Sequence, residues 1–212
     1  MNNFFELAQS RRSIRKFKDI DIPNEDIEYF IKTATMAPSG CNSQCWNFVA
    51  VKNKDIIKKM AEAVSATVED TFSDSNMVTK EYLESKKMAT TFFAKAPVVI
   101  AVFMTEAVYY DKTFTSFLES KGLDYENMMR FFGNFDILTI GAAVQNLLLA
   151  IHEKGYGACW MNDPTIAGNK INEILDVSDE HKLISIIPVG VPAYAPREKK
   201  MKSFEEIYKI IE

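Results

Sequence analysis

The chain has few of the residues on which common enzyme classes depend. Its 212 residues include two histidines, His152 and His181, and three cysteines, Cys41, Cys45 and Cys159. An odd number of cysteines does not complete a disulfide framework and is typical of a reducing compartment, so we expect a cytoplasmic protein. Both histidines lie far in sequence from the one close cysteine pair, which argues against a zinc site.

Long apolar runs, secretion signals and common catalytic motifs are also missing. The longest uninterrupted apolar stretch, residues 96–104, is much shorter than the roughly 18 residues of a membrane span. Residues 1–13 lack the basic and apolar regions of a signal peptide. No G-x-G-x-x-G, G-x-x-x-x-G-K-[ST], G-x-S-x-G or H-E-x-x-H motif occurs. We therefore expect any chemistry to belong to a bound cofactor.

Net charge is low, but the charge is unevenly distributed. With 29 acidic and 25 basic residues the net charge is -4, which argues against a nucleic-acid partner. Yet residues 11–18 (RRSIRKFK) carry five cations and no anion, and residues 197–202 (REKKMK) carry four cations and one anion. Two basic clusters near opposite ends of an acidic chain suggest one anionic ligand held by both. Two solvated surface patches are the alternative.

Hydrophobic periodicity predicts helices and strands that alternate along the chain, with a loop at 73–76 and no internal repeat. Helices are expected over residues 4–9, 24–37, 54–69, 80–95, about 127–154, 164–175 and 203–211, and strands over 46–52, 96–104, 158–161 and 183–191. The helix over about 127–154 is apolar on most sides, so we expect it in the core or at a subunit interface. This order predicts a single domain, residues 1–212, of the α/β or α+β class.

Three segments combine residues that suit a flat, anionic ligand. Arg11, Ser13 and Arg15 alternate, so an extended backbone would project them to one side, where guanidinium groups suit a phosphate. Residues 37–46 (APSGCNSQCW) gather small polar groups between a helix and a strand. Residues 155–162 (GYGACWMN) contain glycines that let the backbone approach a flat ring. A plain polar connection and core packing are the alternatives for the last two segments.

These segments resemble the FMN-dependent nitroreductase superfamily. The resemblance is carried, in family order over nearly the whole chain, by RRSIRKF, APSGCNSQCW, DILTIGAAVQNLLLAIHEKGYGACW, PVGVPAYAPREKK and the terminal FEEI. It implies a nitroreductase-like α+β fold with a central, mostly antiparallel sheet surrounded by helices. It also implies a homodimer in which the long helix forms the interface and two FMN sites lie between the subunits.

The resemblance assigns cofactor contacts residue by residue. The N-terminal residues match phosphate and ribityl contacts, the polar loop matches the family's P-S-x-x-N-x-Q-P-W pattern, and the third segment matches the stretch along the isoalloxazine ring. Two tail lysines match the cations that complete the phosphate site. The residues carried over are Arg11, Arg12, Ser13, Arg15, Pro38, Ser39, Gly40, Asn42, Gln44, Trp160, Met161, Asn162, Lys199 and Lys200. No catalytic side chain and no metal ligand are implied.

The chain departs from the family pattern in three places. Cys45 stands where proline is usual, which predicts a less rigid loop. Met201 stands where a last arginine is expected, so Arg197, Lys199 or Lys200 is left to complete the phosphate site. Residues 105–126 match no family motif. In the family this region tends to cover the substrate face, so its aromatic residues are candidates for a lid: Tyr109, Tyr110, Phe114 and Phe117.

The activity that the resemblance implies is a ping-pong reduction of nitroaromatics, quinones, flavins or enones. NADH or NADPH would deliver hydride to the flavin, and backbone N–H groups near Met161 or Asn162 would stabilise negative charge on the reduced ring. One alternative is a reductive dehalogenase-like flavoenzyme, whose acidic and aromatic lid Glu106, Tyr109 and Glu119 would loosely imitate. The other is a non-enzymatic flavin-binding or sensing module. Neither a nucleic acid nor a membrane is expected as a partner.

Overall fold

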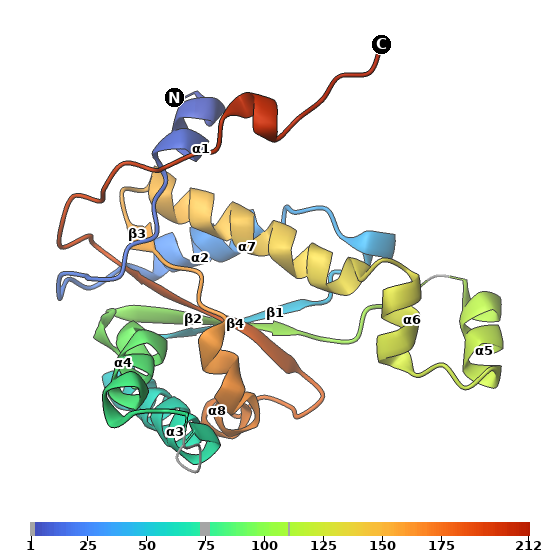
Figure 1. Ribbon diagram of the computed structural model, residues 1–212, viewed down its shortest axis with the longest axis horizontal. Coiled ribbons are helices and arrows are strands. Elements are labelled where there is room, and N and C mark those ends of the chain that lie inside the picture. The colour runs from blue at the N-terminus through green and yellow to red at the C-terminus, as the bar shows by residue number, and fades with distance from the viewer. Residues whose placement is uncertain (1–2, 73–76, 110) are drawn as a thin grey trace.

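A four-stranded antiparallel sheet forms the centre of the protein in the computed structural model, which describes residues 3–72, 77–109 and 111–212 (Figure 1). Its strands are β1 (Trp46–Val51), β2 (Val98–Met104), β3 (Gly157–Ala158) and β4 (Lys182–Gly190). They lie in the order β1-β2-β4-β3, and each neighbouring pair is antiparallel. Every residue of β2 is buried, as the β-branched run predicts.

Helices cover both faces of the sheet and confirm the predicted α+β class. On one face lie α2 (Asn24–Ala34) and α7 (Phe135–Glu153), and on the other lie α3 (Lys54–Phe72), α4 (Lys80–Thr91) and α8 (Gly168–Leu175) (Figure 1). Because side chains alternate along a strand, β2 supplies both cores. Ile100 and Val102 pack beneath α2 and α7, whereas Ala101 and Phe103 pack against α3 and α8.

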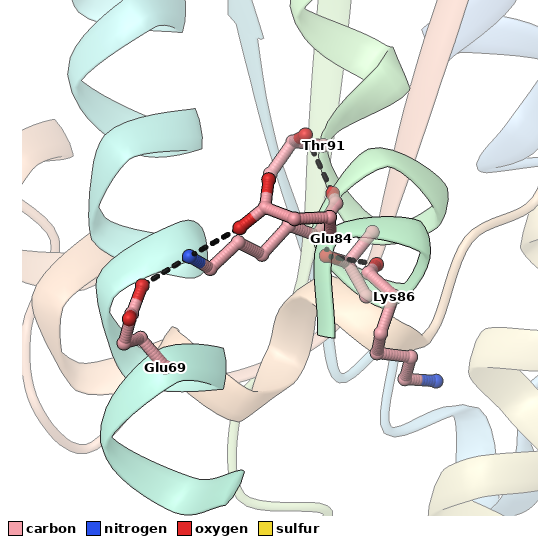
Figure 2. A network of polar contacts seen from close by, with 6 residues as sticks. Glu69, Glu84, Lys86 and Thr91 are labelled. Carbon is pink, nitrogen blue, oxygen red and sulfur yellow. Dashed lines mark hydrogen bonds and ion pairs between the residues drawn. The ribbon is translucent and has the colours of Figure 1, made fainter. Parts of the chain in front are cut away.

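Ion pairs join the helices on the second face. Lys87 of α4 bonds to Glu69 of α3 and to Glu84 one turn earlier, so both carboxylates point toward the same ammonium group (Figure 2). Lys86 pairs with Asp163 at 2.9 Å. Asp163 begins η3 (Asp163–Ala167), directly after the segment predicted to follow a flavin ring. The ion pair between Lys86 and Asp163 therefore joins α4 to the end of that segment.

The predicted long helix over about 127–154 is wrong in its first part, which is a separate helix. Helix α6 (Tyr125–Phe131) ends before Gly133 and Asn134, whose φ angles of 75° and 54° are left-handed. A left-handed residue ends a helix, and Gly-Asn is suited to that position. The apolar pattern continues across the break, which explains the error. A further helix, α5 (Lys112–Ser120), lies in the region without a predicted structure.

Other predicted boundaries also change. The terminal helix expected over 203–211 is only a short exposed turn, η4 (Phe204–Glu206), because a helix this short is not stable without a surface to pack on. The helix expected over 80–95 ends at Thr91 and continues as η2 (Phe92–Lys95), and the one expected over 164–175 is divided into η3 and α8. The strand expected over 158–161 is reduced to β3 and one bridge between Met161 and Ile186. The predicted loop at 73–76 lies outside the described residues.

Helix α7 is long and apolar enough to cross a membrane by length and composition, with a mean hydropathy of 1.5. A mostly buried core helix has the same composition, and 56% of this stretch is buried inside the chain. Val144, Leu147 and Ile151 are fully buried, as predicted. Near its start the helix instead exposes apolar surface, at Ile137 (43% exposed) and Leu138 (67% exposed).

The N-terminal basic segment runs along the edge of the sheet. It follows α1 (Phe4–Ser10), which Asn3 caps through a bond from the Phe5 N–H. Ile14 N donates to the carbonyl oxygen of Ala158 at 2.9 Å, so the segment lies beside β3. Further along, Ala193 N donates to the Lys16 carbonyl at 3.0 Å. The segment is thus held between β3 and the chain that follows β4.

Gly157 is required for this contact, and Gly157→Ala tests it. An added Cβ would lie 2.5 Å from Cγ1 and 2.7 Å from Cβ of Ile14, so the N-terminal segment would have to move. We expect the free energy of unfolding to fall by about 1–3 kcal/mol, measured by urea denaturation. Gly168→Ala is the matched control, because the nearest atom there is 3.7 Å away. Equal losses in the two variants would contradict the packing described.

Candidate functional site

The two predicted basic clusters meet at one cleft of about 420 Å³. The cleft is lined by Arg12, Ser13, Arg15, Tyr194, Pro196 and Arg197. Arg12 Nε donates to the Arg197 carbonyl at 3.2 Å, and its Nη1 donates to the carbonyls of Gln9 at 2.6 Å and Arg11 at 2.9 Å. Arg12 therefore caps the end of α1 and holds the C-terminal chain against the N-terminal segment. Within the described residues, no carboxylate lines this cleft.

Arg11, Ser13 and Arg15 lie on one side of their segment, as the alternation predicts. Their common neighbour is the thiol of Cys159, which the sequence did not place there. Burial raises the pKa of Cys159, and Arg15, Ser13 and Arg11 each act in the opposite direction on the same thiol. All three residues therefore lie near this thiol, although Arg11 lines a different cavity from Ser13 and Arg15.

The structure distinguishes the three tail cations that the sequence left open. Arg197 lines the cleft together with Ser13 and Arg15. Lys199 lines a different cleft, on the other side of Arg12, with Phe5 and Gln9 of α1. Lys200 is exposed. In the part of the chain that the structure describes, it lines neither of these two clefts. Arg197 is therefore the tail cation best placed to share an anion with Arg15.

The polar loop lies at the other end of α7. Its turn, η1 (Gly40–Asn42), is bound to the start of α7 by Gly40 N, which donates to Thr139 Oγ1 at 3.1 Å. Inside the loop, Gln44 N donates to Ser39 Oγ at 3.3 Å, and Gln44 Nε2 donates to Asn42 Oδ1 at 3.2 Å. Pro38 and the side chains of Asn42 and Gln44 are exposed. The predicted loop residues therefore form one ordered, polar unit that faces outward.

This loop contains backbone strain. Cys41, Asn42 and Gln44 have φ angles of 54°, 51° and 45°, in the left-handed region that side chains other than glycine and asparagine rarely adopt. The loop is anchored where Cys45 replaces the family's proline: Cys45 is fully buried, and its carbonyl accepts the Thr105 N–H at 2.9 Å. The lower rigidity expected from that substitution stays a prediction.

The third predicted segment continues from β3 along β4, at the edge of the sheet. Met161 N donates to the Ile186 carbonyl at 3.1 Å, so this N–H is already used, and stabilisation of a reduced ring by N–H groups near Met161 or Asn162 stays a prediction. Asn162 Nδ2 donates to the Ile184 carbonyl at 2.9 Å, which fixes the segment to β4. Trp160 is 37% exposed, and its ring packs beside Gly141 of α7. Trp160 therefore presents an aromatic surface between the cleft and the loop.

Helix α7 separates the basic cleft from the polar loop. Thr139 contacts the loop, whereas His152, near the other end of the helix, lies beside Arg11 and Arg12. At 1.5 Å per residue these two positions are about 20 Å apart along the axis. Within one chain the basic cleft and the polar loop are therefore not adjacent.

The aromatic lid candidates form a cluster on α6. Tyr109 stacks on Phe132, with ring centroids 4.2 Å apart, and Phe114 meets Phe131 and Phe132 edge-on at 5.9 Å. Helices α5 and α6 project from one end of the molecule (Figure 1). Phe117 is exposed on α5, and Tyr110 lies outside the described residues. The region is thus built around aromatic packing, while its role as a lid stays a prediction.

A buried polar pair near the loop was not predicted from the sequence. Asp136 is only 4% exposed, and the Tyr125 hydroxyl donates to it at 3.4 Å while accepting the Ala107 N–H at 2.9 Å. Burial is the main cause that raises the pKa of Tyr125 to about 12. Neither residue belongs to a motif, so no sequence signal indicated the pair. It joins the segment before α5 to the start of α7.

A sequence model of the Nitroreductase family matches residues 8–191. The chain belongs to this family. The iodotyrosine deiodinase of Thermotoga neapolitana is 26% identical over 194 residues, which cover 91% of this chain and 90% of that protein. A BluB-like flavoprotein from Clostridium difficile 630 is 30% identical, with a TM-score of 0.85 and complete coverage of both chains.

The comparisons confirm the predicted nitroreductase-like fold. An iodotyrosine deiodinase structure with bound FMN and 3-iodo-L-tyrosine is 23% identical, with a TM-score of 0.70 and coverage of 98% of this chain and 99% of that one. At that identity the likeness concerns the fold. Within the described residues, no three His, Cys, Asp or Glu side chains are grouped to hold a metal ion.

The left-handed backbone at Cys41 predicts that glycine is more stable than alanine at this position, which is the reverse of the usual order. In an ordinary helix or strand, glycine is less stable than alanine by about 0.5–1 kcal/mol. Because Cys41 is left-handed, we expect Cys41→Gly to be more stable than Cys41→Ala by about 1 kcal/mol. Urea denaturation of the two variants measures the difference. An alanine variant as stable as the glycine variant would contradict the left-handed conformation.

Proposed function

We propose that the chain is an FMN-dependent oxidoreductase that uses NADH or NADPH to reduce an electron-poor organic acceptor. The observation that carries the proposal is the basic cleft, where Ser13 and Arg15 meet Arg197 from the far end of the chain. Membership of the Nitroreductase family supports a flavin as the anionic ligand, and FMN is bound in the deiodinase structure of this fold.

The cleft fits a phosphate ester. Arg12, Arg15 and Arg197 line the cleft with planar guanidinium groups that match phosphate oxygens, and Ser13 adds a hydroxyl donor. Arg11 lines the neighbouring cavity, which shares Arg12 and Pro196 with the cleft. The described lining includes no acidic group that would repel a dianion. Lys199 and Lys200 are left as candidates for contacts from a partner subunit.

The residues of this chain bind and orient the cofactor. When bound, FMN supplies the transfer of two electrons from a nicotinamide to the acceptor. Trp160 and the backbone around Met161 and Asn162 would line the ring, fixed by the bonds to β4. Asn42 and Gln44 would donate to polar atoms of the flavin. None of these contacts requires a general acid or base, which agrees with the scarcity of histidine.

A homodimer would complete the site. Because the loop and the cleft of one chain are about 20 Å apart along α7, an antiparallel partner would place its loop at this chain's cleft. The exposed apolar surface near the start of α7, at Ile137 and Leu138, suits such an interface. Trp160, beside Gly141, extends this surface toward the ring-binding segment.

A second candidate function is reductive dehalogenation, favoured by the deiodinase relatives. Glu106, one of the predicted lid residues, lines a cleft of about 590 Å³ with Tyr125 and Asp136 beside α6. Glu119 lies on α5 and is not among the described residues that line that cleft. Only the acceptor would differ between the two candidates.

Anaerobic stopped-flow tests the activity. We expect FMN-loaded protein to lose its oxidised flavin absorbance on mixing with NADH or NADPH, because the ring faces an open site, and to regain it with an acceptor. Nitroaromatics, quinones and 3-iodotyrosine are then compared as acceptors, with free FMN as the control. Firmly bound FMN that neither nicotinamide reduces would contradict the proposal and favour a flavin-binding module.

Mixed dimers test the shared site. Arg11→Ala with Arg15→Ala removes one cation that lines the cleft and one from the neighbouring cavity, and Asn42→Ala with Gln44→Ala removes the loop's donors. We expect either homodimer to lose FMN, and a mixed dimer, purified through two tags, to bind one FMN because one of its sites keeps both wild-type halves. FMN content is read from absorbance after gel filtration.

The matched control for the cleft variant is Lys16→Ala with Lys18→Ala, which removes the same charge from the same segment outside the cleft. It is expected to keep two FMN per dimer. A mixed dimer without FMN would contradict the shared site, and an FMN-loaded cleft variant would contradict the phosphate assignment.

A further inference from the structure

His152 links the end of α7 to the start of the basic segment. Its Nε2 lies 2.8 Å from Oγ of Ser10, the residue directly before Arg11. Helix α1 has no buried residue, so its position depends on such surface contacts. The Ser10–His152 bond therefore helps to determine where the cation of Arg11 lies.

A small cavity of about 140 Å³ surrounds this bond. The titratable and charged side chains that line it with His152 are Arg11 and Arg12 from the N-terminal segment and Tyr156 from the turn after α7. The neighbours of His152 on its own helix are engaged elsewhere: Glu153 accepts from Tyr29, and Lys154 pairs with Asp26. Burial and the two arginine cations lower the pKa of His152, so the imidazole is neutral in the ligand-free protein at neutral pH.

The hydrogen bonds of Ser10 are compatible with both protonation states of His152. The hydroxyl of Ser10 has one proton and two acceptors within reach, the Leu7 carbonyl at 3.3 Å and Nε2 of a neutral His152 at 2.8 Å. A protonated imidazole carries an N–H on both nitrogens, so Nε2 then donates to Ser10 while Ser10 donates to Leu7. Protonation therefore leaves the bond to Ser10 in place.

We propose that His152 is a proton-linked positioning residue of the phosphate site, which takes up a proton when a phosphate dianion binds beside Arg11. The proposal rests on the proposed FMN function. A dianion reverses the field at the imidazole, because it outweighs the arginine cations that oppose a further positive charge. The proton comes from solvent, and no other bond changes.

The direction of the pH dependence follows from these charges. The pKa of His152 is lowered in the free protein and rises when the phosphate binds. Between the two pKa values, binding takes up one proton, so FMN affinity increases as the pH falls. For each unit by which the pKa of His152 differs between the free protein and the complex, FMN binds about tenfold more tightly at a pH below both pKa values. Above the pKa of the complex, His152 adds no charge to the site.

The test compares FMN affinity in the wild type and in His152→Gln between about pH 5.5 and 8, where histidine titrates. Glutamine can keep a donor near Ser10 but does not titrate. Protonation of the phosphate itself affects both proteins equally, so the ratio of their dissociation constants isolates His152. We expect this ratio to rise as the pH falls. His181→Gln, at the other histidine, is the control. The ratio of its FMN dissociation constant to that of the wild type is expected to stay constant with pH.

Riboflavin, which lacks the phosphate, is the second probe. The ratio of its dissociation constants for His152→Gln and the wild type is expected not to vary with pH. A constant ratio for FMN, or a riboflavin ratio that rises as the FMN ratio does, would overturn the inference while leaving the proposed cofactor intact. Absence of FMN binding by the wild type would overturn both.

A direct reading of the proton comes from NMR. Because the chain has two histidines, His152→Gln identifies the signal of His152 in the wild type. We expect its pKa to lie below that of a free imidazole without ligand and to rise when FMN is added. A pKa that FMN leaves unchanged would contradict the inference.

Discussion

Backbone hydrogen bonds at one edge of the sheet hold the two ends of the chain together, and the candidate site depends on them. Ile14 is bonded to Ala158, and Lys16 and Lys18 are bonded to Ala193 and Val191 beyond β4. These bonds hold cations from both ends close to one another, which their mutual repulsion opposes. A bound anion would relieve that repulsion.

The helices on the two faces of the sheet have different roles. Helices α3, α4 and α8 cover one face and are joined by ion pairs such as Lys87 with Glu69 and Lys86 with Asp163. On the other face α7 separates the cleft from the loop and leaves part of its surface exposed. One face therefore supports the segment at Met161 and Asn162, while the other provides the distance and the surface that a second chain would use.

Local patterns were enough to predict much of this arrangement. The β-branched run predicted β2, and the alternation of Arg11, Ser13 and Arg15 predicted their common side, because both follow from the two-residue period of an extended backbone. Long-range partners were not predictable in the same way. The capping role of Arg12, the burial of Asp136 against Tyr125 and the choice of Arg197 depend on contacts between segments far apart in sequence. The break at Gly133 was missed because the apolar pattern continues across it.

The bond between Arg12 and Arg197 joins residues 185 positions apart. During synthesis, the N-terminal cations leave the ribosome long before the tail that completes their cleft. A nascent chain therefore exposes RRSIRKFK without its counterpart and cannot form the complete cleft until β4 has paired with β2 and the tail has followed. A ligand held by both basic clusters could therefore bind only after synthesis has reached the tail.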